Sequence, residues 1–195
     1  MIKSEVPVSV MRAIYQRSSV RSYLPKRLDQ EAIKSLLDAA VRAPTAIHEE
    51  PWQFVIIQDP DRLKRISGRA KSFFLEEASR AHLDRGGHAL DHFARPEFNI
   101  FYNAGTLIVI CGNAAGPFVA ADCWLAAENL MLAAYSMGLG SCVIGSAVSG
   151  LNTPEVKAEL GIPAESSAIV PIIVGVPTGT TAQTSRNAVK VLAWK

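Results

Sequence analysis

The chain has 195 residues, of which 49% are hydrophobic and 19% are charged, and its formal net charge is +2. This length allows one domain with a sizeable core, and a small charge scattered along the sequence gives no support for a nucleic-acid partner. The charged fraction lies below the roughly 25% of an average globular protein, so we expect part of the apolar surface to be buried between subunits.

The three cysteines favour a cytosolic protein. Cys111, Cys123 and Cys142 have apolar neighbours and no CxxC spacing, which is typical of reduced thiols rather than disulfides. Residues 1–5 lack the apolar run of a signal peptide, and no stretch of about 18 apolar residues could span a membrane. We therefore predict a single cytoplasmic domain over residues 1–195 with no membrane partner.

In the first third of the chain, apolar residues at helical spacing predict a helix over about 7–16 and another over 29–43. Asp29 is a suitable N-terminal cap for the second helix. Residues 52–57 read as a strand that is buried on both faces. An aspartate followed by a proline then predicts a helix over about 59–67.

The central part of the chain is less regular at first. Residues 69–100 mix charges, glycines and histidines, so we expect a helix followed by a mobile segment that could cover a ligand. The apolar run 106–111 predicts a buried strand. Residues 118–137 predict a long helix that is apolar on nearly all sides and ends at Gly138.

Two further elements complete the pattern, a short helix over 153–161 and a core strand over 168–174. An apolar end at 191–194 is expected to dock on another surface. Strands alternate with helices, and no Asn-Gly hairpin signal joins two strands. This order predicts a parallel or mixed sheet that is sandwiched by helices.

The stretch 17–23 reads Arg-Ser-Ser-Val-Arg-Ser-Tyr. Arg17 and Arg21 provide permanently charged, forked donors with hydroxyl groups between them, which together can wrap one phosphate. The alternative is an ordinary basic helix end whose arginines are solvated. Two later loops, 43–52 and 138–146, also combine small and polar residues, which favours a shared ligand.

Other motifs give less support for function. The glycines of 138–145 follow a helix instead of a strand, so they do not match a dinucleotide-binding fingerprint, and Leu151 stands where a phosphate loop requires lysine. No histidine or cysteine spacing predicts a metal site. Cys142 fits core packing better than nucleophilic catalysis, and we assign no catalytic residue. His48 is either a solvated loop residue or a ligand contact.

Three stretches, in this order, resemble the nitroreductase family of flavoproteins: 17–23, 43–52 and 138–145. The similarity covers nearly the whole chain. It implies an α+β fold, a three-layer α/β/α sandwich with a central mixed sheet, in an intertwined homodimer. It also implies one FMN in each of two interface sites, with NADH or NADPH as the electron donor.

The resemblance also implies a set of cofactor-binding residues. The first stretch matches positions that hold the flavin phosphate, ribityl chain or pyrimidine end. The second matches a loop that reaches the flavin from the partner subunit, and the third matches a segment whose backbone amide faces flavin N5. The implied residues are Arg17, Ser18, Ser19, Arg21, Pro44, Thr45, Ala46, His48, Ile144, Gly145 and, as a late basic residue on the phosphate, Arg186.

Two positions depart from the family pattern, which usually has asparagine at His48 and glutamine at Glu50. An amide both donates and accepts hydrogen bonds, whereas an ionised carboxylate only accepts them. The contacts of the second loop are therefore expected to differ, and the acceptor substrate with them.

These observations lead to one functional hypothesis and its alternatives. The hypothesis is an FMN-dependent oxidoreductase that passes hydride from NAD(P)H to a small planar acceptor, such as a nitroaromatic or quinone, by a ping-pong mechanism. The flavin carries the hydride chemistry, so no general acid is required. The alternatives are a non-catalytic flavin- or anion-binding sensor, or other chemistry on the same fold, such as flavin destruction to a benzimidazole or reductive dehalogenation.

Overall fold

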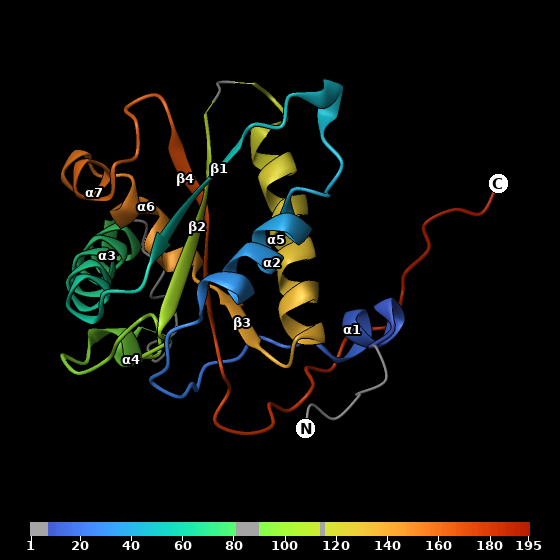
Figure 1. Ribbon diagram of the computed structural model, residues 1–195, viewed down its shortest axis with the longest axis horizontal. Helices are drawn as coiled ribbons and strands as arrows, with labels where there is room; N and C mark the ends of the chain where they lie inside the picture. Colours follow the sequence, from blue (N-terminus) through green and yellow to red (C-terminus); the bar gives the residue numbers. More distant parts are fainter. Residues whose placement is uncertain (1–7, 81–89, 114–115) are drawn as a thin grey trace.

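A four-stranded sheet forms the centre of the protein and carries helices on both faces (Figure 1). The computed structural model describes residues 8–80, 90–113 and 116–195. Two layers of helices enclose the sheet, which confirms the predicted α+β class and its three layers. In spatial order the strands are β1 (Trp52–Ile57), β2 (Thr106–Gly112), β4 (Ser167–Gly175) and β3 (Gly140–Val143).

The three strand pairings are all antiparallel, so the prediction of a parallel or mixed sheet was wrong for these strands. Ile57 at the end of β1 pairs with Leu107 near the start of β2. Gly112 at the end of β2 pairs with Ser167 at the start of β4. The connection from β1 to β2 thus returns to the end of the sheet that it left, as antiparallel neighbours require. In contrast, α5 (Val119–Ser136) carries the chain from the end of β2 back to the opposite end, where β3 begins with Gly140 beside Gly175. The sequence carries no hairpin signal because helices make these returns.

One face of the sheet is covered by α2 (Gln30–Ala40) and α5, and α1 (Val10–Gln16) packs against α5. The predicted end signals are confirmed: Asp29 Oδ1 accepts a hydrogen bond from Ala32 N at 2.7 Å, and Gly138 has φ +73°. Buried residues on this face come from both layers. They include Leu36, Ala40, Ile108, Ile110, Ala126, Leu130, Val170 and Ile172.

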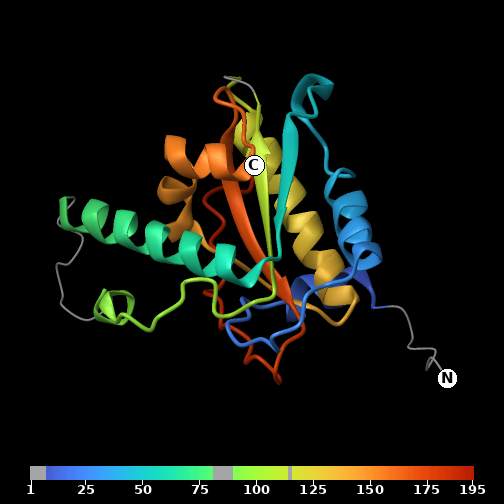
Figure 2. The same ribbon diagram turned by 60° about the vertical axis from the view of Figure 1, so that its left-hand side comes forward.

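The opposite face carries the remaining helices (Figure 2). Thr153 caps the last of them, and Gly161 ends it with φ +69°, both as predicted. The helices of this layer are α3 (Pro60–Arg80), α4 (Asp91–Ala94), α6 (Val148–Leu151) and α7 (Pro154–Leu160), with the 3-10 turn η2 (Gly145–Ala147) before α6.

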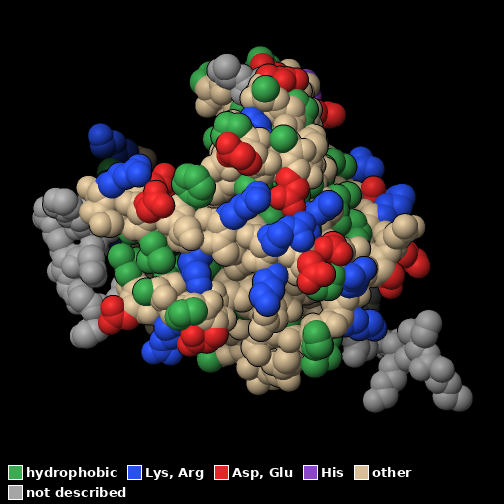
Figure 3. Space-filling model, turned by 90° about the vertical axis from the view of Figure 1, so that its left-hand side faces the viewer, with side chains coloured by type: hydrophobic (Ala, Val, Ile, Leu, Met, Phe, Trp, Pro, Cys, Tyr) green, Lys and Arg blue, Asp and Glu red, His purple; other side chains and the backbone are tan. Residues whose placement is uncertain are grey.

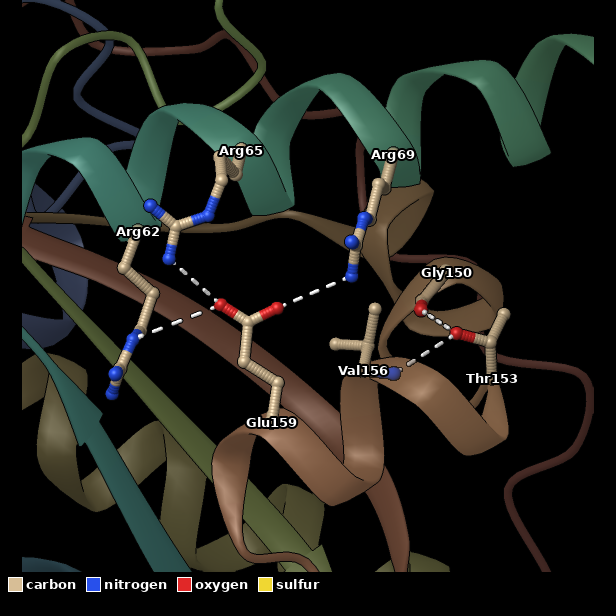
Figure 4. Close-up of polar contacts among 7 residues, drawn as sticks. All are labelled: Arg62, Arg65, Arg69, Gly150, Thr153, Val156 and Glu159. Carbon is tan, nitrogen blue, oxygen red and sulfur yellow. Dashed lines mark hydrogen bonds and ion pairs between the residues drawn. The ribbon is translucent and has the colours of Figure 1, made fainter.

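An ion-pair cluster joins α7 to α3 (Figure 4). The Glu159 carboxylate lies 3.8 Å from Arg62 Nε, 3.0 Å from Arg65 Nη2 and 3.2 Å from Arg69 Nη1. Lys and Arg side chains gather on this face with acidic groups among them (Figure 3). Because the cations outnumber the carboxylate that binds them, the outer face of α3 stays basic.

Three elements differ from their predictions. The helix that begins at Pro60 continues to Arg80 rather than ending near residue 67, and residues 81–89 of the predicted mobile segment lie outside the described residues. β1 was predicted to be buried on both faces, but five of its six residues are at least partly exposed, because it is an edge strand that pairs only with β2. β3 was predicted as a loop, since its four residues are too few to show a period.

Two buried cysteines, Cys111 and Cys123, make the folded state less stable at alkaline pH. Burial raises the pKa of Cys111 to about 11 and of Cys123 to about 12, from an ordinary value of 9.0. Above pH 9 the unfolded chain loses these protons while the folded chain keeps them, so the stability present below pH 9 is lost toward pH 11. We predict a fall in the free energy of unfolding of up to about 1.4 kcal/mol per pH unit for each thiol.

Urea unfolding at several pH values between 8 and 11 measures this slope. Cys123→Ala lowers stability at every pH because it opens a cavity. The free energy of unfolding should nevertheless fall less steeply with pH in this variant, because one of the two thiols is absent. An unchanged slope in this variant would contradict the assignment.

Large apolar side chains are exposed along one side of the molecule. Ile14 and Tyr15 of α1 are 49% and 72% exposed, and Trp124 and Leu125 of α5 are 48% and 46% exposed. The C-terminal segment runs out from the body beside α1, and its Trp194 is 93% exposed (Figure 1). No helix in the described part of the chain is long and apolar enough to cross a membrane.

Candidate functional site

The arginine-rich stretch 17–23 leaves α1 as extended chain and lies beside β3. Val20 N–H donates to Ser141 O at 3.0 Å, and Ser19 pairs with Ser141 in a parallel bridge. Gly140 permits this close approach, because a Cβ at that position would lie 2.8 Å from the Val20 side chain. The stretch is therefore held against β3 at the edge of the sheet by one isolated bridge.

Arg17 is held by α5. Its Nε donates to Glu128 Oε1 at 3.1 Å, and neither terminal amino group of Arg17 has a partner in residues 8–80, 90–113 and 116–195. The side chain borders a cavity of about 400 Å³, with Ser18, Thr180 and Thr181 among its other lining residues. A guanidinium with free N–H groups and several hydroxyls suits a phosphate group.

Arg21 borders a different cavity, of about 130 Å³, together with Cys142, Ile144 and Gly145. Its Cζ lies 6.0 Å from the centre of the Tyr102 ring, and the described residues provide no carboxylate to pair with it. Burial raises the pKa of Cys142, while the nearby Arg21 lowers it. Because burial dominates, this thiol stays protonated and is not an activated nucleophile.

The two arginines do not share a cavity, which corrects the prediction that both wrap one phosphate. Arg17 borders the cavity of about 400 Å³ and Arg21 the cavity of about 130 Å³, although both guanidinium groups lie near enough to the Cys142 thiol to lower its pKa. The helix-end alternative holds for the position of Arg17, which is the C-terminal cap of α1, but the side chain pairs with Glu128 instead of being solvated, and Arg21 lies beyond the helix end. The pair can instead bind opposite ends of one elongated ligand.

A backbone donor is available next to Arg21. Ile144 N–H donates to Pro171 O at 2.9 Å, whereas Gly145 N–H, the first of η2, has no acceptor within the described ranges. The space beside Gly145 is open, because a Cβ there would meet no atom within 4 Å. The Gly145 amide can therefore donate to a ligand atom in this cavity.

The second loop, 44–51, lies apart from these cavities. It contains the turn η1 (Ala46–His48) and sits beside the N-terminal end of α5, where Ala46 N–H donates to Asp122 Oδ1 at 3.2 Å. Pro44, Thr45, Ala46 and His48 line none of the cavities described above. Within one chain, the stretches 17–23 and 138–145 lie side by side, whereas the loop within 43–52 lies apart from both.

Backbone strain marks this loop. Ile47, His48 and Glu50 have φ values of +50°, +58° and +46°. A left-handed backbone costs a non-glycine residue about 1–2 kcal/mol, and such strain concentrates at functional sites. Histidine tolerates this region better than most residues, as asparagine does. The replacement of asparagine by His48 therefore keeps the backbone shape while changing the side-chain chemistry.

Arg186, the late basic residue, is exposed in the C-terminal segment and lines none of these cavities. A larger cavity, of about 990 Å³, lies between α3 and residues 96–105 and is lined by none of the predicted residues. No group of three or more potential metal ligands occurs in the described part of the chain.

Sequence reasoning missed three residues that contact the predicted site residues. They are Glu128, which binds Arg17, Tyr102, which lies beside Arg21, and Asp122, which binds the second loop. The two acidic residues interrupt the otherwise apolar helix predicted over 118–137. A charge inside such a helix was the available signal, because buried carboxylates need partners.

Comparison with known proteins identifies the family. The family model described as "Nitroreductase family" matches residues 14–176. A protein of Archaeoglobus fulgidus named as an NADH dehydrogenase/NAD(P)H nitroreductase is 30% identical over 158 residues, 78% of this chain and 76% of that protein. An iodotyrosine deiodinase of Thermotoga neapolitana is 26% identical over 183 residues, 90% and 92% of the two chains.

A solved structure shares the fold. The nitroreductase of Bacteroides fragilis with bound FMN superimposes with a TM-score of 0.80 at 24% identity, and the match covers 96% of this chain and 99% of that one. The family match spans most of the sequence, including all three stretches that bear the resemblance. This chain belongs to the nitroreductase family.

Proposed function

We propose that the protein is a cytoplasmic, homodimeric, FMN-dependent oxidoreductase that takes hydride from NADH or NADPH and delivers it to a small planar acceptor. The observation that carries this proposal is the placement of free donors along the edge of β3. Arg17 borders one cavity, while Arg21 and the Gly145 amide border another. These are the donors that a flavin with a terminal phosphate requires at its two ends.

Each end of the cofactor has its own binding residues in this proposal. Arg17 holds the phosphate, with hydroxyl or backbone donors from Ser18 and Ser19. Arg21 lies toward the pyrimidine end, where a positive charge favours the reduced cofactor. The Gly145 amide, next to Ile144, donates toward the ring nitrogen that receives the hydride. Bound FMN itself supplies the hydride chemistry.

The second half of each site comes from the partner subunit. The loop that carries Pro44, Thr45, Ala46 and His48 reaches neither cavity of its own chain. α1 and α5 expose several large apolar side chains, which a second copy of the chain would bury. We therefore assign this loop to the flavin site of the other subunit, and Arg186 to the phosphate end once the C-terminal segment is docked.

The acceptor follows from the cavity. Tyr102 and Phe93 line the space beside Ile144, so a planar aromatic ring can stack there. A nitroaromatic or quinone fits this description, and it would enter only after the oxidised nicotinamide has left, as ping-pong kinetics require. Reductive dehalogenation is a second candidate because a deiodinase is similar to this chain over 183 residues.

A spectroscopic experiment tests the proposal. The purified protein should show flavin absorbance, and anaerobic addition of NADPH or NADH should bleach it. Adding a nitroaromatic or a quinone should restore the colour, and initial rates at several acceptor concentrations should give parallel double-reciprocal lines. Halide release from a halogenated phenol would favour dehalogenation. A bound flavin that neither nicotinamide bleaches would identify a non-catalytic binding protein instead.

A further inference from the structure

Little within the second loop explains its own shape. Ile47, the first left-handed residue, is 79% exposed, so burial of its side chain does not hold the backbone. Within the turn, one hydrogen bond joins Glu49 N to Ala46 O at 3.2 Å. Three left-handed residues among four positions therefore need an anchor outside the loop.

Asp122 of α5 is placed to be that anchor. Its side chain is only 2% exposed, and its Oδ1 accepts the Ala46 N–H at 3.2 Å. The loop lies directly beside the N-terminal end of this helix (Figure 1). Because α5 packs along the sheet, it gives the loop a rigid support.

A second contact brings the same loop close to the start of α5. A Cβ on Gly116 would lie 3.3 Å from Glu49 Oε2, so this carboxylate rests against the turn that precedes the helix. The loop and the helix therefore touch on both sides of η1. A shift of either contact would move His48, which lies between them in the chain.

Asp122 lies in the first turn of α5, where the helix dipole favours a negative charge, but this placement does not require the side chain to be buried or to bind the loop. The hydrogen bond that it makes goes to the loop, and its Oδ2 is buried without a partner among the described residues. Burying a charged group with so few partners is costly, so a structural role alone explains it poorly. A methyl or hydroxyl group at this position would pack in the helix without that cost.

We propose that Asp122 is a positioning residue for the flavin site: through Ala46 it fixes the strained second loop in the shape that contacts the cofactor. This inference rests on the proposed function, because it assumes that the loop meets FMN across the dimer. Asp122 touches neither cofactor nor substrate. Its effect reaches the site only through the backbone of residues 46–48.

Two substitutions separate the hydrogen bond from the charge. Asp122→Ala removes the acceptor for Ala46 N–H, and we expect the Kd for FMN to rise at least tenfold and amide exchange of residues 46–48 to accelerate. Asp122→Asn keeps a carbonyl acceptor and removes the buried charge, so it should bind FMN within threefold of the parent protein and be no less stable. Asp38→Ala, on the exposed side of α2, is the matched control.

The readouts are FMN titration, hydrogen exchange and size-exclusion chromatography, which shows whether each variant assembles like the parent protein. An Asp122→Ala variant with the same Kd and the same exchange overturns the inference, as does an Asp122→Asn variant that loses FMN as completely as the alanine variant. If Asp122→Ala does not fold, rapid exchange of the Ala46 amide in the parent protein overturns it. A parent protein that binds no FMN would instead overturn the proposed function.

Discussion

Replacing both Arg17 and Arg21 by alanine is expected to give a folded protein that purifies without flavin colour. Hydrogen bonds to charged groups contribute about 1.5–3 kcal/mol each. Because each factor of ten in affinity corresponds to about 1.4 kcal/mol, the loss of both arginines should raise the Kd for FMN by roughly 10²–10⁴-fold. Arg17 is part-buried against Glu128, so its guanidinium is already oriented before the ligand arrives.

The single variants should differ because the arginines border different cavities. Arg17→Ala is expected mainly to weaken FMN binding. Arg21→Ala should also lower the reduction potential of the bound flavin, since it removes a positive charge near the pyrimidine end. Titration of the apoprotein with FMN measures the affinity, and redox titration of the reconstituted variants measures the potential.

Arg65 and Arg69 provide a matched control for the double variant. They are also four positions apart, but they bind Glu159 on the opposite side of the sheet. The variant with both replaced by alanine should lose some stability and keep its flavin. Equal FMN occupancy in the Arg17/Arg21 variant and in the parent protein would show that the phosphate is bound elsewhere.

Introducing charges among the exposed apolar side chains of α1 and α5 should separate the subunits, and FMN should be released at the same time. Ile14→Glu combined with Trp124→Glu places two carboxylates where α1 and α5 expose apolar surface. Burying an unpaired charge in an interface costs several kcal/mol, so dimerisation should weaken by orders of magnitude. FMN is lost as well, because the second loop belongs to the partner's site in our proposal.

Size-exclusion chromatography with light scattering gives the oligomeric state, and absorbance gives the flavin content. Phe73→Glu is the control, since Phe73 is 41% exposed on α3, in the layer on the other side of the sheet. This variant should remain dimeric and yellow. A dimeric, flavin-loaded Ile14/Trp124 variant would place the interface on another surface.

The prediction of individual elements succeeded where the signal was local. The Asp29 cap and the left-handed Gly138 and Gly161 involve residues within one or two turns of each other. The end of α3 was wrong because Gly68 follows residue 67 like a stop signal, yet the packing of Ala70 and Ala78 in the core continues the helix through it. That packing is made with distant residues.

The candidate site shows the same division. The resemblance named Arg17, Arg21, Ile144 and Gly145 as cofactor-binding residues, which stays a prediction, and the structure places them beside β3, where they border two cavities. It did not reveal that Arg17 is paired with Glu128, 111 positions away in the chain. A residue such as Glu128, which supports the site from a different helix, does not change the hydrophobic pattern of its own helix enough to be recognised.

The sequence by itself determined the α+β class, the capped helix ends, most core strands and the chemical character of the three stretches, because these depend on side chains and on near neighbours. The tertiary structure alone decided the antiparallel direction of the strands, the separation of the two arginines and the contact of Asp122 with Ala46. Each of these depends on how segments far apart in the chain pack against one sheet, and no local pattern encodes that packing.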